Sequence, residues 1–405
     1  MRSLLNRFLL ALAAGHFVVD INANLLPVML PFLRVSLGLS YTETALIATS
    51  YSMTASLAQP LFGYLSDRIG GTKLLVLPIV WMVCFMGASG NAPSYPVLIL
   101  MVTLAGLGSA AYHPQGAANA RRVGGRRAAT AVSVFSLAGI AGFSIGPMLA
   151  AASFSAFGLR GTTVFIPFGL AIALGITLAL RNYSIPAVQH PAGISGVSAK
   201  VPYLTLVALL VVVIMRAWVE AGVVAYTPLR FSSDVMYSSR ILFVYLFGEA
   251  LGTFLGALAA DRFGRRRIII LTSLLLTPAM YFFNVAPGGF ELFVPAGLAG
   301  LLLGASVPVT IVMAQELLPR NVGVASGLMM GFAFGMGGLG VTINGLIADS
   351  YGLGTSLMLF AVLPFAAGLV ALKLPASLEA KDSVHTNIPL QAPGREPAPG
   401  GGTGS

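Results

Sequence analysis

Twelve apolar segments run through this chain, and they restrict its possible folds more than any other feature. A helix needs roughly 20 consecutive apolar residues to cross a bilayer core about 30 Å thick, and each segment is of that order. Turn residues occupy the short links between them, as at 91–93 and 351–354. The pattern therefore predicts an all-α membrane protein. Its twelve helices are expected at 7–33, 43–66, 72–90, 94–117, 128–152, 160–180, 203–230, 237–260, 266–285, 291–317, 322–347 and 354–374.

Composition agrees with this class and excludes several others. Hydrophobic residues make up 57% of the 405 positions and charged residues only 9%. A soluble domain of this size carries far more charge, so the lipid bilayer is the expected partner. The single cysteine, Cys84, excludes a disulfide framework. The sequence shows no phosphate-binding loop, metal-ligand cluster or nucleophile–base arrangement, so we expect no enzyme, no cofactor and no metal site.

The net charge of +10 is explained by membrane orientation rather than by nucleic-acid binding. No basic domain with interleaved aromatic residues is present, so no nucleic-acid partner is expected. If the N-terminus is cytoplasmic, sixteen Lys and Arg residues fall on that side and four on the other, which predicts that both termini are cytoplasmic. The sixteen are Arg2, Arg7, Arg68, Lys73, Arg121, Arg122, Arg126, Arg127, Arg181, Lys200, Arg262, Arg265, Arg266, Arg267, Arg320 and Lys373. The four are Arg34, Arg160, Arg230 and Arg240.

A short charged motif occurs twice, each time between two apolar segments. The first copy spans 63–73 and contains Asp67, and the second spans 257–267 and contains Asp261, 194 residues later. A repeat at half the chain length indicates two homologous halves. We expect an N-terminal half at 1–180, a cytoplasmic linker at 181–202, a C-terminal half at 203–375 and a disordered cytoplasmic tail at 376–405.

These two copies resemble the cytoplasmic signature of the major facilitator superfamily, between helices 2 and 3 and again between helices 8 and 9. The resemblance covers residues 1 to about 375 and implies two six-helix bundles around a central cavity. It assigns a gating role, without substrate contact, to matching positions in both copies. Those positions are Gly63, Asp67, Arg68 and Gly70 in the first copy and Asp261 and Arg262 in the second, which has Ala257 where the pattern prefers glycine.

The fifth segment carries a second motif of small residues. Gly142, Gly146 and Pro147 combine close helix approach with a bend, and they are also expected to act in gating. The run resembles the helix-5 motif of proton-driven drug antiporters in the same superfamily, except that Ala150 replaces a final glycine.

Ionisable residues inside the apolar segments indicate where function lies, because each costs about 2.5–3.5 kcal/mol to insert. In the first segment His16 and Asp20 share a helix face, and Asn24 continues that face. In the seventh segment Arg216 and Glu220 repeat the same spacing. We expect Asp20, His16 and Glu220 to couple protons and Arg216 to bind an anionic substrate. The alternative for both pairs is a structural role.

The fourth segment adds a histidine beside a proline. His113 follows Tyr112 and is separated from Gln115 only by Pro114. A histidine at a proline break can titrate near physiological pH, or it can serve as a hydrogen-bonding strut. We expect His113 to take part in both proton coupling and substrate binding. The full predicted substrate set is Arg216, Asn24, Tyr112, His113 and Gln115.

Several runs narrow the resemblance to one branch of the superfamily. They lie at 16–20, 24–27, 112–117, 313–319 and 326–328. Together they resemble the fosmidomycin resistance proteins, which are bacterial inner-membrane exporters, although Gln115 stands where some relatives are expected to have an acid. The resemblance implies a monomeric proton-coupled antiporter that exports a small anionic or amphiphilic compound. A proton-coupled uptake carrier for an organic anion and a transporter-like receptor are the alternatives.

Overall fold

The computed structural model describes residues 7–69, 73–124, 128–181, 203–318 and 322–375, and within these ranges it contains helices and no strands. Several predictions lie outside the described residues. They concern Gly70, the linker beyond Arg181, the tail, and the side chains of Asp67 and Arg68.

The described helices of the N-terminal half form six membrane-length segments, some of them built from two pieces. They are α1 (Arg7–Ala23) with α2 (Leu25–Leu37), α3 (Tyr41–Leu57) with α4 (Gln59–Ile69), α5 (Lys73–Ser89), α6 (Tyr95–Gly124), α7 (Ala128–Phe157), and the 3-10 turn η2 (Gly158–Val164) with α8 (Phe165–Leu180).

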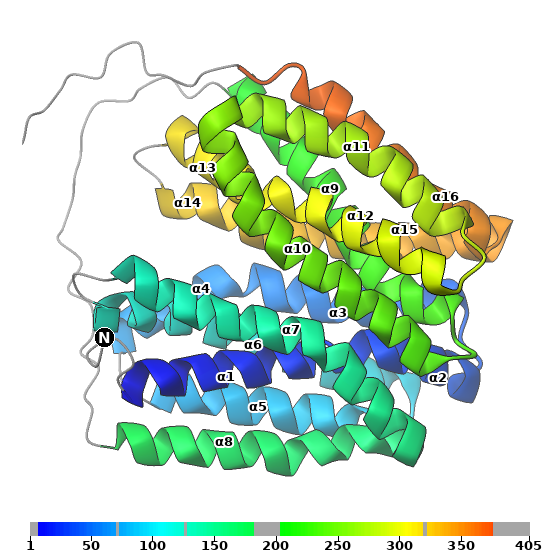
Figure 1. Cartoon of the computed structure of the whole chain (residues 1–405). Coiled ribbons are helices and arrows are strands. Elements are labelled where there is room, and N and C mark those ends of the chain that lie inside the picture. The colour runs from blue at the N-terminus through cyan, green and yellow to red at the C-terminus, as the bar shows by residue number, and fades with distance from the viewer. Residues whose placement is uncertain (1–6, 70–72, 125–127, 182–202, 319–321, 376–405) are drawn as a thin grey trace, which may run out of the picture.

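The described helices of the C-terminal half form six more segments, which lie against the first six as a second bundle (Figure 1). They are α9 (Tyr203–Arg230), α10 (Val235–Phe263), α11 (Arg265–Val285), η3 (Phe290–Leu292) with α12 (Phe293–Ala305) and α13 (Val307–Leu317), α14 (Val322–Ser326) with the π-helical η4 (Gly327–Phe332) and α15 (Ala333–Tyr351), and α16 (Leu353–Ala371).

Length and hydropathy alone select nine candidate membrane spans among the described residues, and three features explain the difference from twelve. The span Thr130–Leu180 contains two segments, and the apolar part of α5 is short. The α3–α4 segment is the least apolar, because seven of the 17 residues in α3 are Ser or Thr. Ser52 and Ser56 among them line the cavity, and Thr49 contacts the other bundle.

The first segment breaks at Asn24, inside the predicted helix 7–33. Pro27 lacks an amide hydrogen, and its ring collides with the carbonyl of Ala23 in a regular helix. The Asn24 amide is accordingly shared between the Asp20 and Ile21 carbonyls, at 3.3 and 3.1 Å. The break places the end of α1, with Asp20, beside the cavity.

Two predicted helix ends were wrong in the same way. The helix expected to end at 117 continues to Gly124 with Pro114 inside it, and the helix expected to end at 152 continues to Phe157 with Pro147 inside it. A membrane helix tolerates an internal proline when neighbouring groups satisfy the freed carbonyl. Neither proline ends its helix.

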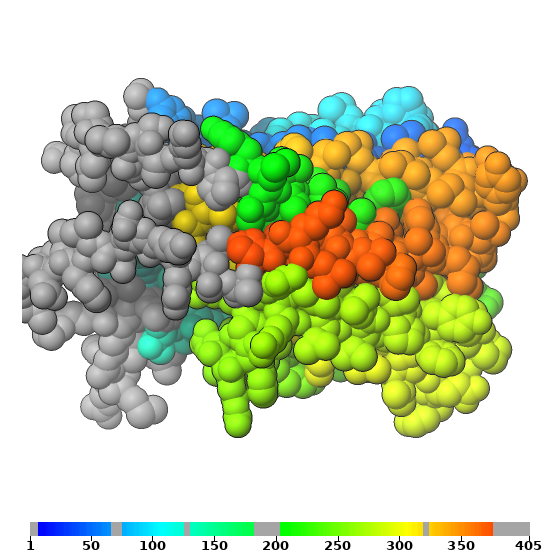
Figure 2. Space-filling view, turned by 90° about the horizontal axis from the view of Figure 1, so that it is seen from above, coloured from blue at the N-terminus to red at the C-terminus, as the bar shows by residue number. Residues whose placement is uncertain are grey.

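The closest helix packing joins α10 to α12 and rests on five glycines. A Cβ atom at Gly300 would overlap the Tyr245 carbonyl, and one at Gly304 would overlap the Glu249 carbonyl. On the facing helix the same holds at Gly252, against Leu301. The remaining glycines of this contact are Gly248 and Gly256. These two helices therefore form a rigid pair within the C-terminal bundle. On the outer face of that bundle, α16 packs between α11 and α9 (Figure 2).

The two bundles meet along α3 and α15 on one side of the cavity and along α7 and α10 on the other. Thr49 on α3 donates a hydrogen bond to the Gly338 carbonyl at 2.6 Å, and its hydroxyl lies 2.8 Å from that of Thr342. We call the end of the molecule that carries Arg121, Arg122 and Arg265–Arg267 the basic end. The end that carries Tyr41 and Asp349 is the opposite end.

Candidate functional site

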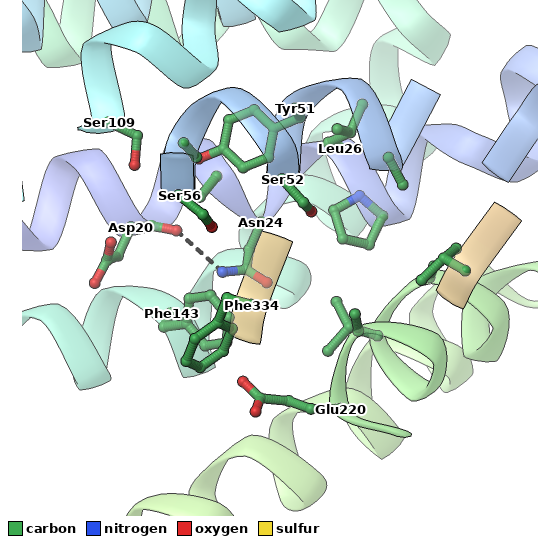
Figure 3. A pocket seen from close by; sticks show the side chains of 18 of the residues that line it. Asp20, Asn24, Leu26, Tyr51, Ser52, Ser56, Ser109, Phe143, Glu220 and Phe334 are labelled. Carbon is green, nitrogen blue, oxygen red and sulfur yellow. Dashed lines mark hydrogen bonds between the residues drawn. The ribbon is translucent and has the colours of Figure 1, made fainter. Parts of the chain in front are cut away.

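A cavity of about 360 Å³ lies between the bundles. Its walls come from α1, α2, α3, α4, α6 and α7 in one half and from α9, η4 and α15 in the other, and most of the lining is apolar. Asp20 and Glu220 face it from opposite halves, with Phe143 and Phe334 between them (Figure 3). His113 and Tyr51 also line it.

The structure brings three predicted coupling residues into one cluster on the N-terminal wall. His16 Nε2 lies 3.3 Å from Asp20 Oδ2, and His113 Nε2 lies 3.2 Å from Asp20 Oδ1. Asp20 and His16 lie on adjacent turns of α1, whereas His113 reaches them from α6. The carboxylate is thus held between two imidazole rings, each on its own oxygen.

The other nitrogen of each ring is held by the backbone. His16 Nδ1 lies 2.9 Å from the Phe135 carbonyl oxygen, and His113 Nδ1 lies 2.8 Å from the Ser109 carbonyl oxygen. A carbonyl oxygen only accepts hydrogen bonds, so Nδ1 of each ring carries the hydrogen. A ring that is neutral in this orientation points the lone pair of Nε2 at Asp20. The bare α7 surface at Gly139 makes room for His16, because a Cβ there would overlap the ring.

This orientation leaves three acceptors facing one another unless a cation joins them. An ionised carboxylate accepts only, and a neutral Nε2 with Nδ1 protonated also accepts. Each of the two contacts with Asp20 therefore becomes a hydrogen bond only when its Nε2, or the carboxylate, binds a proton. The cluster's net charge is −1 without added protons, 0 with one and +1 with two. Proton binding here changes the charge of the cavity wall.

The same three residues also have the ligand types of a metal site. One nitrogen or oxygen from each lies within 4.8 Å of the others, and a backbone-bound Nδ1 is the usual support for a histidine ligand. We predicted no metal-ligand cluster from the sequence, because His113 is 93 residues from Asp20. The three residues thus present donor atoms to either a proton or a metal ion.

The C-terminal wall carries the second predicted pair. Arg216 Nη1 donates to Glu220 Oε2 at 3.0 Å, and both side chains are buried. Glu220 lines the cavity, whereas Arg216 lies outside its lining, with its guanidinium 5.6 Å from the centre of the Phe334 ring. Tyr245 and Glu249 of α10 interact electrostatically with this pair.

The remaining predicted substrate residues divide into two groups. Asn24 lines the cavity and donates to the backbone carbonyl of Asp20 at 3.2 Å (Figure 3). Tyr112 and Gln115 are buried away from the lining, and the Tyr112 hydroxyl donates to the Leu12 carbonyl at 2.6 Å. Tyr51 of α3 lines the cavity, although the sequence did not single it out. It was missed because it lies in a Ser- and Thr-rich helix in which no charged residue marks the cavity-facing side.

Those predicted gating residues whose side chains the structure describes lie apart from the cavity lining. Gly142 and Gly146 let α7 approach α1, since a Cβ at either would crowd Phe17 or Asn24. Asp261 and Arg262 are exposed at the basic end of α10. Gly63 lies on α4, where an added Cβ would be 3.7 Å from Pro114 Cβ. Pro147 lies inside α7.

The sequence of the chain matches a known protein family. The model of the Major Facilitator Superfamily matches residues 12–239 and 223–394. The chain belongs to the major facilitator superfamily. The assignment confirms the predicted fold of twelve transmembrane helices in two six-helix bundles. Members of the superfamily are membrane transporters, so the chain is a multi-pass transporter and not an enzyme.

Named relatives extend over nearly the whole transporter. The Escherichia coli (strain K12) fosmidomycin resistance protein is 28% identical over 387 residues, which cover 90% of this chain and 92% of that protein. The uncharacterized MFS-type transporter YfnC of Bacillus subtilis (strain 168) is 29% identical, with 92% and 94% covered. The crystal structure of a bacterial homologue of the human lysosomal transporter Spinster, inward-facing and occupied, superimposes with a TM-score of 0.75 at 16% identity, covering 90% and 95%. That likeness shows the fold.

Proposed function

We propose that this transporter exports a small anionic or amphiphilic drug-like compound in exchange for protons. In this proposal it acts as a monomer in the bacterial inner membrane, with both termini in the cytoplasm. The distribution of Lys and Arg supports the orientation.

The observation that carries the proposal is the cluster of His16, Asp20 and His113. An exchanger needs a group whose proton occupancy changes its affinity for the substrate. The geometry of the cluster supports this role, because each proton would change its charge by one unit and two of its members line the cavity between the bundles. Asp20 is the shared acid, and the two rings give it separate proton routes from α1 and α6.

The apolar and aromatic lining supports an amphiphilic substrate. Phe143 and Phe334 from opposite halves flank the space between Asp20 and Glu220 (Figure 3). Arg216 supplies the fixed positive charge for an acidic group of the substrate, and it becomes available when Glu220 releases it. Fosmidomycin serves as the first probe, because a relative that matches nearly the whole chain is named for resistance to it.

The alternative is uptake of an organic anion together with protons. The same cavity and cluster serve both directions, so the sign of the proton flux separates them. In export by exchange, substrate and protons cross the membrane in opposite directions. In uptake by symport they cross in the same direction.

The test has two stages. Growth inhibition by a panel of compounds that includes fosmidomycin is compared between cells that lack the gene and cells that overexpress it. A compound tolerated better on overexpression is then added to proteoliposomes that contain the purified transporter and an internal pH-sensitive dye. We expect protons to leave the compartment that the compound enters. Co-directional movement would replace export by the uptake alternative, and substrate flux without proton movement would refute coupling.

A further inference from the structure

The opposite end of the molecule holds a contact between the bundles that the transport residues do not explain. Asp349, near the end of α15, reaches the first turn of α3, more than 300 residues earlier in the chain. Its Oδ1 accepts a hydrogen bond from the Tyr41 amide at 2.8 Å. Its Oδ2 accepts from the Thr42 amide at 2.9 Å and from the Thr42 hydroxyl at 2.6 Å.

The start of α3 leaves these two amides available. The first amides of a helix have no partner within it and need one from outside. Ser40 caps its own helix by accepting from the Glu43 amide, while Glu43 accepts from the Ser40 amide at 2.9 Å. This reciprocal cap does not reach Tyr41 or Thr42. The carboxylate from the other bundle completes it, and the positive end of the α3 dipole favours its charge.

Neighbouring residues on α15 are shaped for the same contact. Gly345 lies one turn before Asp349 on the same face, and a Cβ there would be 2.8 Å from Thr42 Cα. Two and three turns before Asp349, Thr342 and Gly338 contact Thr49 of α3. Gly338, Thr342 and Gly345 thus bring the backbone of α15 close to that of α3, so that the short side chain of Asp349 reaches the α3 amides.

We propose that Asp349 is a latch that holds the opposite end of the transporter closed by capping α3 across the bundle interface. Opening that end separates α15 from α3, which breaks all three hydrogen bonds and leaves two helix amides without their partner. The latch rests on the proposed transport cycle, in which each end opens in turn.

The sequence around the latch repeats the spacing of the gating motif. Gly345, Asp349 and Gly352 have the separations of Gly63, Asp67 and Gly70. The first set ends α15 at the opposite end, and Gly63 and Asp67 of the second lie in the last turns of α4 at the basic end. Each end of the molecule thus has an aspartate flanked by glycines at the same sequence spacing, Asp349 at the opposite end and Asp67 at the basic end.

Distance measurements between spin labels test the latch directly. Cysteines are introduced at the exposed Ser36 and Phe290, one in each half at the opposite end, after Cys84→Ser removes the single native thiol. Loss of a capping side chain changes a helix equilibrium by roughly 2- to 30-fold, so Asp349→Ala should raise the population with long label distances by that factor. Gly345→Ala should act in the same direction, because its Cβ forces α15 from α3.

Asp234→Ala is the matched control. Asp234 caps α10 by accepting from the Tyr237 amide at 2.8 Å, so it is a helix cap at the same end that lies within one bundle. Its loss should leave the distances unchanged. Unchanged distances in both Asp349→Ala and Gly345→Ala, or an equal shift in Asp234→Ala, would overturn the latch. If the two α15 variants shift the distances but the unsubstituted transporter shows no proton-driven transport, the proposed function is refuted and the latch stands. If the unsubstituted transporter shows proton-driven transport but neither variant shifts the distances, only the latch is refuted.

Discussion

At the residue scale, one hydrogen atom on each of two imidazole rings decides what the cavity wall can do. The Phe135 and Ser109 carbonyls fix that hydrogen on Nδ1, which turns both Nε2 lone pairs toward Asp20. A ring free to rotate would satisfy Asp20 without binding a proton. The backbone of α6 and α7 thereby orients both rings toward Asp20, although neither carbonyl carries charge.

Asp20→Asn tests the shared acid. The amide keeps the shape of the side chain but cannot carry the negative charge that both rings need as a partner. Substrate-driven proton movement in proteoliposomes should fall to the level of empty vesicles, while exchange of labelled substrate without a gradient continues in part. Glu291→Gln, which changes an exposed carboxylate outside the cavity, should leave both rates unaltered. Normal pH dependence in the Asp20→Asn protein would remove Asp20 from the coupling site.

Arg216 and Glu220 allow a structural role to be separated from a binding role. Removing one partner of a buried ion pair costs about 3–5 kcal/mol, because the other charge is left unpaired. Arg216→Ala should therefore lower the melting temperature in detergent, and Arg216→Met combined with Glu220→Gln should recover most of it. If Arg216 also binds the substrate anion, the double variant will be stable and yet show no substrate-induced stabilisation. Stabilisation of the double variant by substrate would assign Arg216 to structure alone.

At the scale of the helices, the sequence predicted segments better than it predicted their interruptions. Both bounds of α9 were correct because polar or charged residues mark its ends. The breaks at Asn24, Ala58 and Ser306 were missed, because hydropathy continues across them. The cavity residues divide similarly. Asp20 was visible as a charge in an apolar run, whereas Tyr51 was hidden in a helix face whose role depends on the partner bundle.

The pairing of α10 with α12 gives a prediction about packing. A side chain at Gly300 has no space, because its Cβ would overlap the Tyr245 carbonyl. Overpacking of a core typically costs about 1–3 kcal/mol, so Gly300→Val should lower the melting temperature by several degrees. Gly175→Val on α8 is the control, since a Cβ there meets no atom within 4 Å. Equal melting temperatures for the two variants would contradict the rigid pairing.

At the scale of the whole molecule, the substrate path lies between two bundles that must separate alternately at each end. The repeat in the sequence predicted the two halves from the motif copies, because a duplicated unit leaves its spacing in the chain. It did not predict which surfaces meet. The contact of α3 with α15 depends on small residues and hydroxyls, such as Gly338 and Thr49, that also occur on faces turned elsewhere.

The gating prediction for Asp67 belongs to this scale. Asp67→Asn should slow transport more than it weakens substrate binding, because the residue is expected to stabilise one state of the gate without touching the substrate. Flux in proteoliposomes and equilibrium binding of the same compound are measured on one preparation. Weak binding with normal turnover would place Asp67 in the substrate path instead.

The glycine contact between α10 and α12 also bears on how such a transporter changes during evolution. Positions where any added atom collides with a neighbouring backbone admit almost no variation, whereas the cavity-lining residues of α3, such as Tyr51 and Ser56, border open space and can exchange side chains at lower cost. New substrate preferences are thus expected to arise by drift along α3, while the C-terminal pair supplies an inherited frame that constrains every descendant alike.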